Sequence, residues 1–194
     1  MDIAEFLQEA YRLKAVKRTG WILEGVRDPE SVADHSFGTA LLALVLGAGR
    51  KGLDHGKAVK MALIHDLAEC RTGDILPPHG VEYHRSRGRA IPPGTHGIPK
   101  ERKQLLERAA MEQLCEKLPG LLALWEELEN GASAEARFVK DLDKLERLIQ
   151  AVLYGEREGK EIRWFQQEEN QPQDPQLREV FQEFLRSRGE SPGS

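Results

Sequence analysis

Hydrophobic residues recur every three to four positions along most of this chain, which is the spacing of one face of a helix. The same spacing predicts helices over residues 2–16, 32–49, 55–70, 100–117, 119–130, 134–156 and 175–187. The second and third of these are apolar on nearly every side, which indicates a central position. No segment shows the alternation typical of a strand. The pattern therefore predicts an all-α fold, a compact helical bundle.

Two segments lack this spacing. Residues 17–31 are interrupted by Gly20, Gly25 and Pro29, and we expect them to be non-helical. Residues 76–99 are rich in Pro, Gly, His and Arg, and we expect a long loop, either a surface loop or a lid that meets phosphate. Its basic residues are His79, His84, Arg85, Arg87, Arg89 and His96. We expect one domain over residues 1–188 and a disordered tail at 189–194.

Composition narrows the functional classes. The chain has 194 residues, enough for one domain, and a formal net charge of −4, which gives no general affinity for nucleic acid or acidic membranes. Cys70 and Cys115 form no paired motif, so we expect reduced thiols and a cytoplasmic location. The acidic, amphipathic first segment is unlike a signal peptide, and the apolar run 37–48 is too short to span a membrane.

Residues 62–74, "ALIHDLAECRTGD", place His65, Asp66, Glu69 and Asp74 within ten positions of an apolar run. Burial of these groups is costly unless something compensates their charge. His35 stands in the first turn of another apolar helix. Mixed imidazole and carboxylate ligands suit a divalent transition ion such as Mn²⁺, Co²⁺, Fe²⁺ or Zn²⁺. The alternative is a hydrogen-bonded core pair without chemistry.

The motifs "ESVADHS", "ALIHDLAE" followed by "TGDI", and "FVKDLD" resemble those of the HD-domain superfamily of metal-dependent phosphohydrolases. Within it, the chain resembles the 5′-deoxynucleotidase family through "RTGW", "PESVADH", "LIHDLAECRTGDI", "IPKER" and "SAEARFVKDLDKLE". This resemblance covers about residues 5–155 and implies the compact HD-domain helical bundle.

The resemblance also implies roles for individual residues. It implies four metal ligands, which are His35, His65, Asp66 and Asp143. Glu69 would face the water or the nucleotide and be needed for turnover, and Asp74 would line the site. These two carboxylates would also hold a second ion, if one binds.

One ligand conflicts with the helical pattern. The helix over 134–156 has an apolar face that contains Leu142 and Leu145, and Asp141 falls within that arc. Asp143 falls to the other side. The pattern alone favours Asp141 as the buried acid, whereas the motif favours Asp143. We follow the motif, because a site helix need not keep its ligand on its most apolar face.

The segment "KRTGW" predicts the substrate end of the site. Arg18 offers a planar fork suited to phosphate, and Trp21 offers a flat wall for a sugar or base. The resemblance implies that the arginine contacts the nucleotide phosphate and that the tryptophan disfavours a 2′-hydroxyl. The alternative is a surface arginine and a core tryptophan.

These features predict a metal-dependent 5′-deoxynucleotidase that hydrolyses deoxyribonucleoside 5′-monophosphates to a deoxynucleoside and phosphate, with Mn²⁺, Co²⁺ or a similar ion. The resemblance implies a homodimer. Two enzymatic alternatives share the metal core: a deoxynucleoside triphosphohydrolase and a cyclic-nucleotide phosphodiesterase. A third alternative is a nucleotide-sensing module without turnover.

Overall fold

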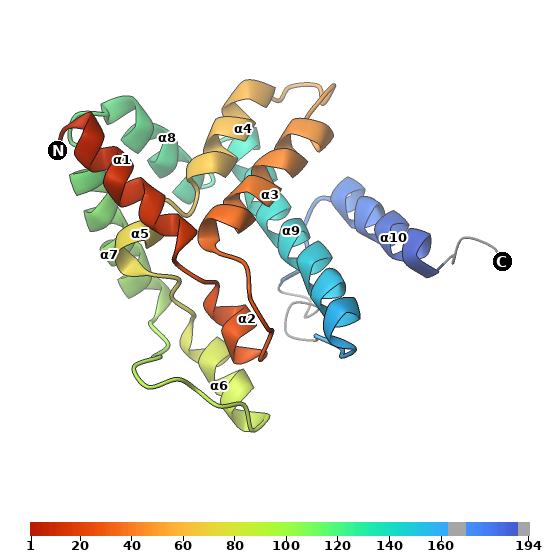
Figure 1. Ribbon diagram of the computed structural model, residues 1–194. Coiled ribbons are helices and arrows are strands. Elements are labelled where there is room, and N and C mark those ends of the chain that lie inside the picture. Colours follow the sequence, from red (N-terminus) through yellow and green to blue (C-terminus); the bar gives the residue numbers. More distant parts are fainter. Residues whose placement is uncertain (163–169, 190–194) are drawn as a thin grey trace.

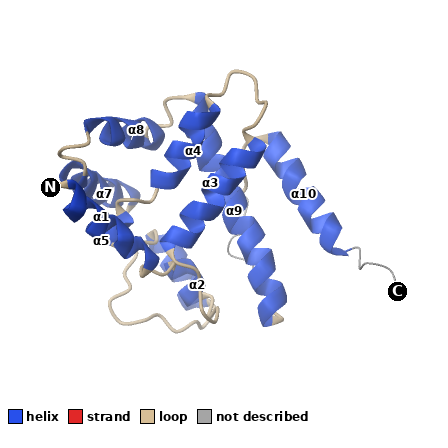
Figure 2. Cartoon of the chain, turned by 45° about the horizontal axis from the view of Figure 1, so that its top comes forward, coloured by secondary structure: helices blue, strands red, loops and turns tan. Residues whose placement is uncertain are grey.

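The computed structural model describes residues 1–162 and 170–189, and these residues form helices joined by turns (Figures 1 and 2). Within these two described ranges no strand forms. Lys17 and Ser31 make an isolated antiparallel bridge. The all-α prediction is confirmed. The helices are α1 (Ile3–Tyr11), η1 (Arg12–Lys14), α2 (Thr19–Leu23), α3 (Val32–Leu46), α4 (His55–Ile64), α5 (Glu69–Thr72), α6 (Pro78–Ser86), α7 (Lys100–Leu114), α8 (Pro119–Glu129), α9 (Ala134–Glu158) and α10 (Pro175–Gly189).

Local sequence fixes where the two principal site helices begin and end. Ser31 caps α3, because its side chain accepts a hydrogen bond from the Asp34 backbone N–H and the Asp34 carboxylate accepts one from the Ser31 backbone N–H. Ser133 caps α9, because its side chain accepts a hydrogen bond from the Ala136 backbone N–H. Gly159 ends α9 with a φ of 64°, a left-handed conformation that favours glycine.

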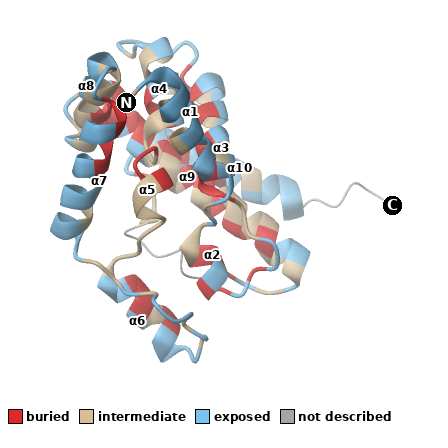
Figure 3. Ribbon diagram, turned by 60° about the vertical axis from the view of Figure 1, so that its left-hand side comes forward, coloured by how far each residue is buried: buried red, intermediate tan, exposed pale blue. Residues whose placement is uncertain are grey.

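The helices enclose two neighbouring hydrophobic cores. Helices α3, α4 and α9 cross at the centre of the molecule, and α10 packs against α9 (Figure 1). Their core includes Met61, Leu142 and Leu145, whereas a second core under α7 and α8 includes Leu67 and Met111. Many of the buried residues, red in Figure 3, lie where these helices meet. The connection from α4 to α5 joins the two cores, and it carries part of the candidate site.

The predicted helix over 55–70 is wrong as a continuous element. Helix α4 ends at Ile64, and residues 65–68 form turns before the short helix α5. His65 Nδ1 lies 2.8 Å from the Ala62 carbonyl oxygen, the group that would accept the next helical bond, and Trp125 Nε1 donates to the His65 carbonyl oxygen at 3.3 Å. Such side-chain bonds compete with the helical ladder. Asp66 and Glu69 therefore do not share one regular helix.

The predicted loop over 76–99 also contains a helix. Helix α6 begins at Pro78, a residue suited to the first helical position, and Val81 and His84 are buried. The Ile98 N–H donates to the Leu76 carbonyl oxygen at 3.0 Å, which closes the base of the segment. Gly97 lies so close to this point that a Cβ there would come within 2.3 Å of Pro78 Cα. The segment is therefore a long connection whose two ends are held together and whose middle contains a helix.

Four further expectations can be compared with the structure. Residues 17–31 contain the five-residue helix α2, so they are not wholly irregular. Helix α3 is central, but Phe37, Leu41, Leu44 and Val45 are exposed along one side of it. The predicted tail lies outside the described residues except for Gly189, which ends α10. Within the described ranges, no helix has the length and apolarity that crossing a bilayer requires.

Candidate metal centre and active site

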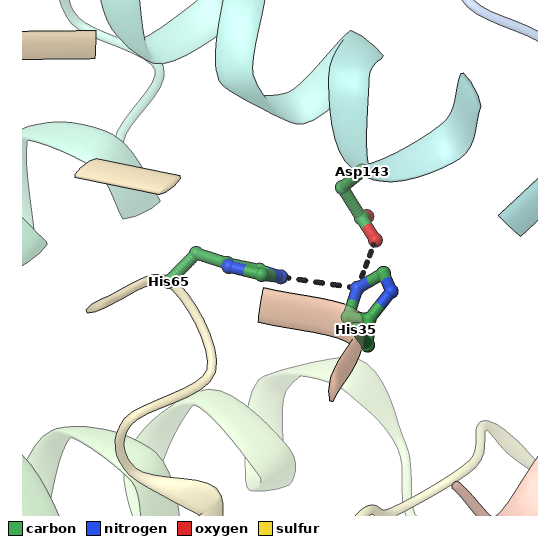
Figure 4. A group of neighbouring side chains, drawn as sticks. All are labelled: His35, His65 and Asp143. Carbon is green, nitrogen blue, oxygen red and sulfur yellow. Dashed lines mark hydrogen bonds and ion pairs between the residues drawn. The ribbon is translucent and has the colours of Figure 1, made fainter. Parts of the chain in front are cut away.

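Three side chains from distant parts of the chain converge between α3, α9 and the end of α4 (Figure 4). His35 Nε2 lies 3.2 Å from His65 Nε2 and 3.0 Å from Asp143 Oδ1. One ligand atom from each of these residues lies within 4.8 Å of the others. Asp66 adds a carboxylate, since its Oδ2 lies 3.2 Å from His65 Nε2 and 3.7 Å from His35 Nε2. The four predicted ligands are therefore neighbours.

The opposite ring nitrogens explain why both Nε2 atoms face this centre. His65 Nδ1 lies 2.8 Å from the Ala62 carbonyl oxygen, and His35 Nδ1 lies 2.5 Å from Glu146 Oε2. Hydrogen bonds at Nδ1 direct the lone pair of a neutral imidazole to Nε2. Two Nε2 lone pairs at 3.2 Å repel each other unless a cation or a proton lies between them. The donor set fits a divalent transition ion.

Asp141 and Asp143 take different places although both are on α9. Asp143 Oδ1 meets His35, and its Oδ2 accepts a hydrogen bond from Arg147 Nη2 at 3.1 Å. Asp141 Oδ2 accepts a hydrogen bond from the backbone N–H of Asp174 at 2.7 Å. Asp141 thus anchors the chain before α10, and Asp143 faces the centre. Of the two acids, Asp143 therefore lies beside the predicted histidine ligands, and its role as a metal ligand stays a prediction.

Arg18 reaches the centre from the N-terminal end of α2. Its Nη1 lies 3.0 Å from Asp66 Oδ2, 3.4 Å from Asp74 Oδ1 and 3.8 Å from Glu69 Oε2. Asp74 is fixed by Thr19, whose backbone N–H donates to Asp74 Oδ2 at 2.6 Å and whose hydroxyl donates to the Asp74 carbonyl oxygen at 2.6 Å. One guanidinium group therefore contacts three of the site carboxylates, which are Asp66, Glu69 and Asp74.

Backbone bonds hold Arg18 at this position. The Arg18 N–H donates to the Glu30 carbonyl oxygen at 3.1 Å, and the Val32 N–H donates to the Val16 carbonyl oxygen at 2.8 Å. These bonds tie the segment before α2 to the start of α3, which carries His35. The predicted substrate arginine and the first predicted metal ligand are thus fixed to each other by the main chain.

Neighbouring cations keep two of the acidic groups ionised. Burial acts to raise the pKa of Asp66, but His65 and Arg18 outweigh it and hold that pKa well below its usual range. Burial also opposes ionisation of Asp143, but Arg147 is among the cations that hold its pKa far below the usual range. Both carboxylates are therefore charged at neutral pH and available as ligands.

The pKa values of both His35 and Glu69 are raised, so the clustered carboxylates favour the protonated form of each group. Burial and Arg18 act to lower the pKa of His35, yet Glu146 and Asp143 together outweigh them, and the pKa rises to about 10. Burial, together with the neighbouring charge of Asp66, raises the pKa of Glu69 well above its usual range. A divalent cation at the centre would relieve the mutual repulsion of these carboxylates.

Trp21 lies behind the centre. Its side chain is only 1% exposed, its Nε1 donates to Glu30 Oε1 at 2.8 Å, and its ring meets the edge of Tyr154 at 5.2 Å. Glu30 and Glu146 both lie close to His35, and burial together with Glu146 raises the pKa of Glu30 to about 7. Trp21 is thus part of the packed layer that supports the site. Its predicted contact with the sugar stays a prediction.

Two cavities adjoin the centre. A cavity of about 110 Å³, the α2-side cavity, is lined by Arg18, Gly20, Trp21, Asp74, Leu76, Pro77, His79, Arg147 and Asn170. A cavity of about 250 Å³, the α8–α9 cavity, is lined by His65, Asp66, Leu128, Glu129, Val139, Lys140, Asp143 and Lys144. The segment predicted as a loop therefore contributes a wall to the site through its first residues. Whether it acts as a lid stays a prediction.

Sequence reasoning missed several polar residues of the site, among them Glu146, Thr19 and Lys103. Glu146 follows Asp143 by three positions, so helical spacing could have placed both on one side of α9. Thr19 gave no such signal beyond its place next to Arg18. Lys103, which contacts Glu69 at 3.1 Å, comes from α7 and is 34 positions away, so nothing local marks it.

Comparison with known proteins identifies the family. The sequence profile of the HD domain matches residues 10–185. Human 5′-deoxynucleotidase HDDC2 is 40% identical over 164 residues, which cover 82% of this chain and 71% of the human protein. The 5′-deoxynucleotidase hdd1 of Schizosaccharomyces pombe is 30% identical over 178 residues, which cover 84% of this chain and 80% of hdd1.

Solved structures agree with the sequence comparison. A conserved hypothetical protein from Pyrococcus furiosus superposes with a TM-score of 0.72 at 32% identity, covering 94% of this chain and 99% of that one. A predicted metal-dependent phosphohydrolase from Magnetospirillum magnetotacticum superposes with a TM-score of 0.56 at 28% identity. The match covers 76% of this chain and 68% of that one. The resemblance drawn from the motifs is confirmed. This chain belongs to the HD-domain family, and to the part of that family that contains the HDDC2 proteins.

Proposed function

We propose that this protein is a metal-dependent 5′-deoxynucleotidase, which hydrolyses deoxyribonucleoside 5′-monophosphates to a deoxynucleoside and inorganic phosphate. The names of HDDC2 and hdd1, at 40% and 30% identity, support this reaction class. The observation that carries the proposal is the convergence of His35, His65 and Asp143 beside Arg18 and a buried Glu69. A phosphomonoesterase of this kind needs a metal centre, a cation for the phosphate and a carboxylate near the attacking water.

The proposed ligands of one divalent ion, such as Mn²⁺ or Co²⁺, are His35, His65, Asp66 and Asp143. When bound, such an ion would supply Lewis-acid chemistry that neutralises phosphoryl charge and eases the ionisation of water. A second ion, if one binds, would use Glu69 together with Asp74.

The remaining residues have proposed roles that follow from their positions. Arg18 would exchange part of its contact with the site carboxylates for the substrate phosphate, which its planar fork suits. Glu69 would orient the attacking water or take its proton. As water attacks phosphorus, the bond to the 5′-oxygen breaks and that oxygen gains a proton. Asp74, held by Thr19, would supply that proton or hold the 3′-hydroxyl, and Trp21 would close the cavity beside the sugar.

We also propose that the enzyme is a homodimer that works in the cytoplasm. The exposed apolar side of α3, which consists of Phe37, Leu41, Leu44 and Val45, supports an interface between two copies. Cys70 and Cys115 are buried free thiols, which suits a reducing compartment.

Phosphate release from a panel of nucleotides tests the function. Metal-free protein would be supplied with Mn²⁺, Co²⁺ or no metal, and assayed on 5′-dNMPs, 5′-NMPs, 3′-monophosphates, dNTPs and cyclic nucleotides. We expect metal-dependent release from 5′-dNMPs, with ribonucleotides and 3′-monophosphates as poorer substrates. Equal rates on AMP and dAMP would remove Trp21 as a sugar discriminator. Release of triphosphate from dNTPs would replace the proposal, and binding without turnover would indicate a sensor.

A further inference from the structure

The two carboxylate oxygens of Glu69 have different surroundings. The side chain is only 1% exposed, and Oε1 accepts a hydrogen bond from Lys103 Nζ at 3.1 Å. Within the part of the chain that the structure describes, Oε2 has no hydrogen-bond partner, and Arg18 Nη1 lies 3.8 Å from it. A buried carboxylate is costly unless cations compensate it. Lys103 and Arg18 approach Glu69 from different elements, and each is nearest to a different oxygen.

Lys103 is itself held in place. It lies in the first turns of α7, and its Nζ also contacts Glu107 Oε1 at 3.2 Å, one turn further along the helix. Its side chain is 28% exposed, so most of its stem is covered. Helix α7 packs against α5, the short helix that begins with Glu69. The position of the ammonium group is thus set by a long helix and not by a mobile segment.

We propose that Lys103 is a positioning residue for Glu69, because it ties Oε1 to α7 and leaves Oε2 as the oxygen that serves the attacking water. This inference rests on the proposed function, in which Glu69 acts on that water. Helix α5 has only four residues, and the polar contacts to its first side chain, Glu69, come from other elements. Among these contacts, the hydrogen bond from Lys103 fixes which oxygen faces α7. Orientation of this kind is worth a large part of the rate, since a misplacement of about 1 Å costs about 100-fold.

A direct contact between Lys103 and the substrate phosphate is the competing role, and steady-state kinetics separate the two. A positioning residue acts through Glu69, so its loss lowers kcat and leaves KM nearly unchanged. A phosphate-binding residue contributes to substrate affinity, so its loss raises KM. A purely structural residue would lower stability and metal content together with activity.

The experiment compares Lys103→Met, Lys103→Arg, Glu69→Gln and the double variant Lys103→Met/Glu69→Gln. We expect Lys103→Met to bind its metal normally, to keep KM within about threefold, and to lose about 100-fold in kcat. Lys103→Arg should recover part of this loss. The double variant should be no slower than Glu69→Gln alone, because Lys103 has nothing left to position. Lys100→Met, at the exposed start of the same helix, is the matched control and should match the wild type.

Four results would overturn the inference. In Lys103→Met these are a wild-type kcat, a raised KM with unchanged kcat, or a loss of stability and metal content together with activity. In the double variant it is a loss that multiplies those of the single variants. The comparison is run on every phosphate ester that the wild type cleaves, including p-nitrophenyl phosphate. Failure of the wild type on 5′-dNMPs would count against the proposed substrate, whereas equal activity of wild type and Lys103→Met on a cleaved ester would count against Lys103.

Discussion

At the residue scale, the carboxylate of Glu146 joins α9 to α3 through His35. Glu146 Oε2 lies 2.5 Å from His35 Nδ1, and Glu146 is one turn beyond Asp143 on the same helix. Helix α9 therefore supplies a proposed ligand and also the group that orients another ligand. Gly38 makes room for this, since a Cβ at that position would come within 2.8 Å of Glu146 Oε1. Partners of this kind fix the ring orientation of metal-binding histidines.

The variant Glu146→Gln should bind Mn²⁺ or Co²⁺ about 10–100-fold more weakly than the wild type, because the amide is a poorer partner for His35 Nδ1. Calorimetric titration of the metal-free proteins measures this directly. Asp141→Asn is the control, since Asp141 serves the backbone of Asp174 and not the centre. Unchanged affinity in Glu146→Gln would contradict the orienting role. Loss of metal binding in Asp141→Asn would indicate that Asp141, and not Asp143, is the metal ligand.

At the element scale, α6 converts part of a polar segment into a wall of the site. Its buried side includes Val81 and His84, and Arg89 Nη2 donates to Glu24 Oε2 at 3.1 Å, which holds the far end of the segment against the chain that follows α2. Burial, with the charges of Arg89 and Arg87, lowers the pKa of His84 to about 4. The imidazole is therefore neutral in the folded protein even at mildly acidic pH.

This depressed pKa predicts acid destabilisation. Between about pH 6.5 and pH 4 the unfolded chain protonates His84 while the folded chain does not, so the free energy of unfolding falls as the pH falls through that range. The loss at this one group is about 2 kcal/mol by pH 4.5. Glu24 Oε1 lies 3.7 Å from His84 Nδ1, and the pKa of His84 is lowered despite this neighbour.

Thermal unfolding of wild type and His84→Leu over pH 4.5–7.5 checks this expectation. The melting temperature of the variant should fall less on acidification, because the variant has no imidazole to protonate. His79→Gln, at an exposed position of the same helix, should follow the wild type. Parallel curves for the wild type and His84→Leu would contradict the assignment.

Hydrophobic spacing predicts the long helices because their apolar faces carry the signal. Helix α9 matches its predicted range within two residues for this reason. Helix α6 escapes prediction because it has nine residues and a single buried aliphatic side chain, Val81. The break after α4 escapes because the apolar run continues through Leu67 and Ala68, whereas a cause of the break, the bond from Trp125 to His65, spans 60 positions. Short-range patterns cannot contain such information.

At the scale of the whole molecule, the site is built by bringing distant segments together between two cores. Motifs could name His35, His65, Asp66 and Asp143, since each lies in a short stretch that resembles its family. Lys103 could not be named, because its contact with Glu69 exists only once α7 packs on α5. The proposed metal ligands could thus be named from the sequence, whereas several residues that contact them or their neighbours could not.

The exposed side of α3 is the surface on which the proposed homodimer would form. Phe37 is 66% exposed and Val45 is 61% exposed, and Leu41 and Leu44 lie between them at helical spacing. This set, the α3 face, is self-complementary in the sense that a two-fold axis can pair it with itself. A charge placed in such an interface loses its hydration without gaining a partner.

We therefore expect Leu44→Glu to raise the dimer dissociation constant by about 100-fold, which corresponds to roughly 2.7 kcal/mol. Analytical ultracentrifugation over a range of concentrations measures the constant, and circular dichroism checks that helix content is kept. Leu105→Glu places the same charge on α7, where Leu105 is 69% exposed, and should leave the dimer intact. A wild type that stays monomeric would refute the homodimer. A dimer that survives Leu44→Glu but not Leu105→Glu would move the interface from α3 to α7, away from the helix that carries His35.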